Sequence, residues 1–193
     1  MRAFDRSLGL LVRALTATAE PIQRLFGFEH APRGLLPGER AVLFDALGDA
    51  IDLDPVRIVR SRSLDTWVPG EGHVARAIGQ TIYMPTADLA APDGDLSGAT
   101  LVHEACHVVQ FQRGGSAYIG DSVRAQLGCI VRGQSRSGAY DWRSALAEGR
   151  PWAELGAEQQ AALIEDAWRS RSIDQRVREA LEEARGGRGW CGC

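Results

Sequence analysis

The chain has 193 residues, which is enough for one domain with a hydrophobic core and short for two. Its apolar fraction of 45% and charged fraction of 24% are those of an ordinary globular protein. The net charge is -3, so electrostatics give no reason to expect a nucleic-acid partner. No stretch is long and apolar enough to predict a membrane span.

Residues 1–34 predict an N-terminal helical arm, because apolar residues recur there at helical spacing. The apolar run over residues 8–16 carries Arg13, and no convincing cleavage site follows it. We therefore expect an amphipathic helix rather than a secretory signal. Without such a signal, we expect a cytoplasmic protein with four reduced cysteines, and export by a non-classical route is the alternative.

We expect residues 35–172 to form the main domain of the protein. Helical spacing over residues 39–50 is followed by a short strand at 56–59. A β-hairpin is expected over residues 73–84, with its turn at Gly79-Gln80.

The second half of the chain predicts four helices. Asp95 or Ser97 can cap the first, which ends at Gly114-Gly115. The others are expected at residues 116–131, 157–170 and 173–184. Charged residues lie nearly all round the last helix, so residues 173–193 predict a helix that stands partly free and a mobile tail with Cys191 and Cys193. The fold class is therefore α+β, mostly α.

The segment His103-Glu104-Ala105-Cys106-His107 indicates a metal site. Histidines four apart project from the same face of a helix, so both imidazoles can reach one ion. A glutamate directly after the first histidine can take a proton from water activated by the metal. This pattern is typical of zinc peptidases, with Zn²⁺ as the expected cofactor and Glu104 as the general base.

The context of this helix supports the same interpretation. Leu101, Ala105, Val108 and Val109 form an apolar stripe opposite the histidines, as expected for a site helix anchored to a core. Cys106 is expected to be a small packing residue, because a free cysteine behaves as a small hydrophobe.

A catalytic zinc ion needs a third protein ligand. Position 113 is Arg113, so no third histidine follows at close spacing, and His30 and His73 are expected to be exposed or structural. Glu158 and Glu165 lie seven residues apart on one predicted helix and share a face, so either can serve. Asp166 could orient an imidazole through its other ring nitrogen.

The His-Glu-x-x-His motif, with a glutamate on a later helix, resembles the gluzincin branch of zinc peptidases. Within that branch the chain is similar to bacterial Vgr-related metallopeptidase-like proteins associated with contractile injection systems. The similarity rests on residues 37–40, 48–53, 79–83, 101–112 and 158–161, and it spans roughly residues 35–170.

This resemblance implies a minimal zincin-like fold, with a short hairpin edge packed on the metal helix. It implies His103, His107 and Glu158 as ligands, Glu104 as the base, and Glu165 as the reserve ligand. Many small gluzincins carry Asp four residues after the third ligand, whereas this chain has Ala162.

A peptidase also needs a donor for the oxyanion that forms during attack on the carbonyl. Tyr118, Tyr140 and His73 are the candidates, and Tyr140 lies in a loop-like stretch from which it could reach over the site. The predicted function is hydrolysis of a peptide or protein substrate. The alternative is an inactive zincin-fold binding or accessory module of a secretion or contractile injection system.

Overall fold

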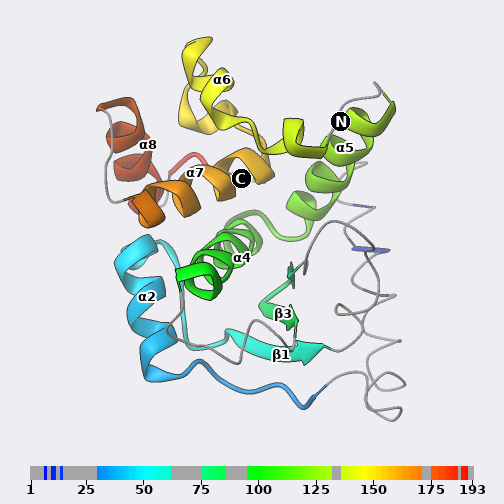
Figure 1. Ribbon diagram of the computed structural model, residues 1–193. Helices are drawn as coiled ribbons and strands as arrows, with labels where there is room; N and C mark the ends of the chain where they lie inside the picture. The colour runs from blue at the N-terminus through cyan, green and yellow to red at the C-terminus, as the bar shows by residue number, and fades with distance from the viewer. Residues whose placement is uncertain are drawn as a thin grey trace.

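The described part of the chain is mostly helical, with one small mixed sheet (Figure 1). The computed structural model describes residues 7, 10, 11, 14, 30–61, 75–85, 95–131, 136–170, 175–186 and 188–190. Residues 7, 10, 11 and 14 of the predicted arm are helical. The rest of that arm up to residue 29, together with His73, Cys191 and Cys193, lies outside the described residues. The α+β, mostly α class is confirmed.

The sheet has the strand order β1–β3–β2. Its strands are β1 (Arg57–Ser61), β2 (Arg76–Ile78) and β3 (Thr81–Pro85). β2 and β3 form the predicted hairpin, and Gly79 takes a φ of 67° in its turn, a conformation that favours glycine. β1 pairs in parallel with the central strand β3, so that Ile58 lies opposite Ile82. β2 is therefore left at one edge of the sheet.

Helix α4 (Asp95–Gly114) lies at the centre of the molecule. Figure 1 shows it between the sheet on one side and α7 (Ala157–Ser170) on the other. Helices α2 (Pro37–Leu47) and α5 (Ala117–Val131) also pack against α4. The predicted helices over 157–170 and 116–131 are thus confirmed, the second to within a residue.

The segment between α5 and α7 contains three short helices that the apolar spacing did not predict. They are η2 (Arg136–Tyr140), α6 (Trp142–Ala147) and η3 (Trp152–Glu154), and a similar 3-10 turn, η1 (Gly48–Ala50), follows α2. Tyr140 is therefore the last residue of a 3-10 helix rather than part of a loop. Elements of one to two turns are too short to display a hydrophobic period.

Helix α8 (Gln175–Arg185) does not stand partly free, so that expectation is wrong. Val177, Ala180, Leu181 and Ala184 are buried and belong to the same core cluster as α4 and α7. Their spacing of three and four residues is a narrow apolar stripe among many charges, and that stripe suffices to dock the helix. Trp190, beyond α8, is also buried, at 2% exposure, and it belongs to the same core cluster.

Candidate metal centre

The two histidines of α4 lie side by side on the face that is turned toward α7. Their ring centroids are 5.2 Å apart. The opposite stripe predicted from the sequence is buried in the core, which fixes the helix and with it the direction of both imidazoles. Cys106 is a fully buried free thiol in the same core, as expected of a packing residue.

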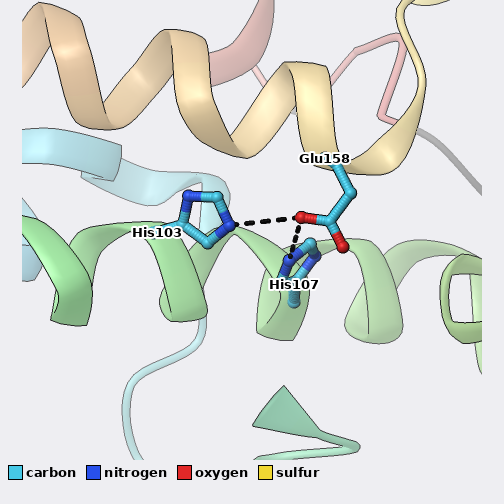
Figure 2. Close-up of side chains that lie close together, drawn as sticks. All are labelled: His103, His107 and Glu158. Atoms are coloured by element: carbon cyan, nitrogen blue, oxygen red, sulfur yellow. Dashed lines mark hydrogen bonds and ion pairs between the residues drawn. The ribbon is translucent and has the colours of Figure 1, made fainter. Parts of the chain in front are cut away.

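Helix α7 brings Glu158 to these histidines. The Oδ2 atom of Asp121 on α5 accepts a hydrogen bond of 2.9 Å from the Ala157 backbone N–H, which caps the first turn of α7. Glu158 follows directly, and Figure 2 shows its carboxylate pointing at both rings. Its Oε2 atom lies 3.3 Å from Nε2 of His103 and 3.5 Å from Nε2 of His107.

These three side chains form a group that could hold a metal ion. Two ligands that bind one zinc ion at about 2.1 Å in tetrahedral geometry are separated by about 3.4 Å. The two Glu158 contacts match that separation, and they are longer than good N–H···O hydrogen bonds, which span about 2.7–3.2 Å. Two imidazole nitrogens and one carboxylate oxygen are also a donor set that zinc uses. The residues present therefore fit a metal of this kind.

Glu165 takes a different place from Glu158. Its Oε2 atom lies 3.0 Å from Nδ1 of His103, the ring nitrogen that faces away from Glu158, and its Oε1 atom accepts from Arg169 at 2.8 Å. The role of Glu165 as a reserve ligand is thus not supported by this arrangement. A carboxylate bonded to Nδ1 orients the ring and leaves Nε2 for a metal.

Asp166 does not take the orienting role considered for it. Its Oδ2 atom accepts from the Trp142 indole at 3.0 Å and pairs with Arg143 at 2.9 Å. Adjacent residues on a helix point about 100° apart, so Glu165 and Asp166 could not both face His103.

Glu104 is buried, at 6% exposure, between α4 and the edge strand β2. Its carboxyl group accepts a hydrogen bond from the Ala77 backbone N–H. Its Oε2 atom, however, is buried and has no hydrogen-bond partner within the described part of the protein. A buried carboxylate oxygen without a partner is costly, and a catalytic role or a bound water or ion accounts for such an atom.

Burial and neighbouring charges shift the pKa values of this cluster in opposite directions. Burial opposes the charge on His103, but Glu158 and Glu165 outweigh it and raise the pKa of His103 to about 10. Burial likewise opposes charge on His107, and Glu158 again reverses the effect and raises its pKa. Burial alone would raise the pKa of Glu158, yet the two histidines hold it well below the ordinary value. Burial raises the pKa of Glu104.

A cavity of about 480 Å³ opens over this cluster. His103, Glu104, His107 and Glu158 line one part of it, and Ile78, Ile119 and Val123 line an apolar part. The lining therefore combines titratable and apolar side chains, the combination common in small-molecule and peptide sites.

The candidate donors to the oxyanion differ in their surroundings. Tyr140 lines the cavity, and its ring lies 5.9 Å from that of His103. Tyr118 stacks on His107 at 5.6 Å, but its hydroxyl donates to the Ala77 carbonyl at 2.9 Å and accepts from the Gly79 N–H at 3.1 Å. Its hydroxyl proton is therefore already engaged. His73 lies outside the described residues, and His30 is exposed.

Gln110 and Gln160 are the residues of this region that the sequence reasoning missed. Both are fully buried, and Gln110 contacts His107 directly, with its Oε1 atom 2.8 Å from Nδ1. One sequence signal was present: Gln110 lies three residues after His107 on the same helix, a spacing at which side chains meet.

No protein-family model, curated protein or solved structure matches this chain. Among the described residues, no helix combines the length and the apolar character that crossing a bilayer requires.

Proposed function

We propose that the protein is a zinc-dependent peptidase with His103, His107 and Glu158 as ligands and Glu104 as general base. One observation carries the proposal: Glu104, whose buried Oε2 has no hydrogen-bond partner among the described residues, lines the same cavity as three converging metal donors. The similarity of the motif to gluzincins and to Vgr-related metallopeptidase-like proteins supports the same activity. When bound, a zinc ion would supply a Lewis acid that makes water acidic near neutral pH.

Glu104 would accept the proton of the attacking water and pass it to the leaving amine. Its raised pKa suits this task, because a base works best when its pKa lies near the working pH. Tyr140 lines the cavity beside His103 and would donate to the developing oxyanion, whereas the hydroxyl of Tyr118 donates to a backbone carbonyl. Ile78, Ile119 and Val123 would contact an apolar side chain of the substrate.

The test compares the native protein with Glu104→Gln on a mixture of unstructured peptides. The amide keeps the size of the side chain but cannot take a proton, so kcat/KM should fall by about 10²–10⁴ while zinc remains bound. Elemental analysis measures the bound metal. Glu182→Gln, an exposed glutamate on α8, far from the ligands in sequence, is the matched control and should cleave normally.

Equal cleavage by the native protein and by Glu104→Gln would sink the proposal. Bound zinc without cleavage by the native chain on any peptide would instead indicate a metal-bearing binding module.

A further inference from the structure

Two buried glutamines connect His107 to three backbone carbonyls. Gln110 on α4 meets His107 through its Oε1 atom at 2.8 Å, and its Nε2 atom donates to the Ala157 carbonyl at 3.0 Å and to Oε1 of Gln160 at 3.2 Å. Gln160 on α7 in turn donates through Nε2 to the Trp152 carbonyl at 3.1 Å and the Gly189 carbonyl at 2.8 Å. We call this pair the glutamine relay.

The backbone carbonyls fix the direction of every bond in the glutamine relay. A carbonyl oxygen can only accept, so Nε2 of Gln160 must face Trp152 and Gly189, which turns its Oε1 toward Gln110. Oε1 of Gln160 and the Ala157 carbonyl then both require Nε2 of Gln110. The remaining atom, Oε1 of Gln110, can only accept from His107. His107 must therefore carry its proton on Nδ1.

This arrangement is costly unless it serves a purpose. Both glutamines are fully buried, and a buried amide is tolerated only when its polar atoms are bonded, whereas an apolar residue of similar size would need no partners. Every polar atom of the glutamine relay has a partner, so the relay is rigid as well as directional. A rigid acceptor at Nδ1 holds Nε2 of His107 toward Glu158.

We propose that Gln110, supported by Gln160, is a positioning residue that locks His107 in the Nδ1–H tautomer and thereby sets the metal affinity of the site. His103 has its own acceptor at Nδ1, Glu165, so each candidate ligand is oriented separately. The inference rests on the metal-binding half of the proposed function and does not depend on peptide cleavage.

The first test is the zinc affinity of Gln110→Met, measured by competition with a chromophoric chelator. Methionine keeps the length of the side chain but offers no good acceptor, so affinity should fall by about 10–100-fold. Gln112→Met is the matched control. Gln112 lies on the same helix, and its amide makes two hydrogen bonds, to the Asp52 N–H at 2.9 Å and the Asp52 carbonyl at 2.8 Å. This control should keep the native zinc affinity.

The second test uses Gln160→Met, again with Gln112→Met as its control. Gln110 keeps its bond to Ala157 in Gln160→Met, so zinc affinity should fall less than in Gln110→Met. Nuclear magnetic resonance of the zinc-loaded protein should show the His107 Nδ1–H exchanging with solvent faster in both relay variants than in the native protein. Gln112 bonds the backbone of Asp52 instead, and its variant should leave both readouts unchanged.

Native zinc affinity and native Nδ1–H exchange in Gln110→Met would overturn the inference, as would a native protein that binds no zinc. If Gln110→Met does not fold, native zinc affinity and native Nδ1–H exchange in Gln160→Met would overturn the inference instead. Relay-dependent zinc binding without peptide cleavage would leave the inference standing and remove the peptidase activity. Peptide cleavage together with zinc binding that does not depend on the glutamine relay would overturn the inference and leave the proposed peptidase activity standing.

Discussion

At the scale of single residues, Glu104 and Glu158 show how position separates two like groups. Both are buried, and burial alone would raise the pKa of each. Glu158 contacts both imidazoles, and their charge holds its pKa well below the ordinary value, as suits an anionic ligand. Glu104 keeps a raised pKa and one oxygen without a partner, as suits a proton acceptor.

The pKa of His103 predicts how metal binding depends on pH. Its value is raised from 6.5 to about 10 against the effect of burial, because Glu158 and Glu165 stabilise the charged ring. This stabilisation is complete below pH 6.5 and is lost as the pH rises through about 10. A metal must displace that proton, so zinc affinity should rise by up to about tenfold per pH unit for each proton released.

Calorimetry in two buffers of different ionisation enthalpy measures this release. We expect about one proton or more per zinc ion at pH 8. Replacing the exposed His30 by Gln should leave the number unchanged. Zinc binding with no proton release at pH 8 would contradict the assignment of His103 as a ligand.

At the scale of elements, the start of α7 determines where the third donor lies. Asp121 of α5 caps the Ala157 N–H, one residue before Glu158, so the register of α7 on α4 depends on a bond from a third helix. The contact between α4 and α7 is the most extensive between any two of the described elements, and it holds together the two helices that carry the candidate ligands.

Asp121→Ala should therefore weaken both the fold and the metal site. Loss of a helix cap costs about 1 kcal/mol, measured as a lower midpoint in urea unfolding. Zinc affinity should fall as well, because the first turn of α7 carries Glu158. Asp141→Ala is the control: Asp141 caps α6 through the Ser144 N–H at 3.0 Å, and α6 carries no proposed ligand. Equal zinc affinity in both variants would contradict the argument.

The long helices α4, α5 and α7 were predictable from the sequence, because the spacing of their apolar residues is local information. The hairpin followed from Gly79-Gln80 between two apolar runs. Spacing could not separate Glu158 from Glu165, since both share a face of α7, and only the packing of α7 on α4 assigns each to a different ring nitrogen. Burial of Gln110 and Gln160 has no sequence signature, because both look like surface residues.

At the scale of the whole molecule, the C-terminal segment is joined to the site. Trp190 stacks edge-on against Trp152 at 5.1 Å, and the Trp152 indole donates to the Arg188 carbonyl at 3.0 Å. The intervening Gly189 carbonyl accepts from Gln160, whose Oε1 atom bonds Gln110 beside His107. Residues far apart in sequence thus share one hydrogen-bonded network, which α8 and its narrow apolar stripe hold in the core.

Gly189→Ala tests this connection. Gly189 has a φ of 67°, and an added Cβ would lie 2.9 Å from Cδ1 of Trp152, so the segment would have to move away from Gln160. Gly149→Ala is the matched control, because Gly149 has a φ of 83° but open space around it. Both variants should lose about 1–2 kcal/mol of unfolding free energy from backbone strain. Only Gly189→Ala should also bind zinc more weakly, because its shift removes one carbonyl that orients Gln160. Equal zinc affinity in the two variants would show that the segment only stabilises the fold.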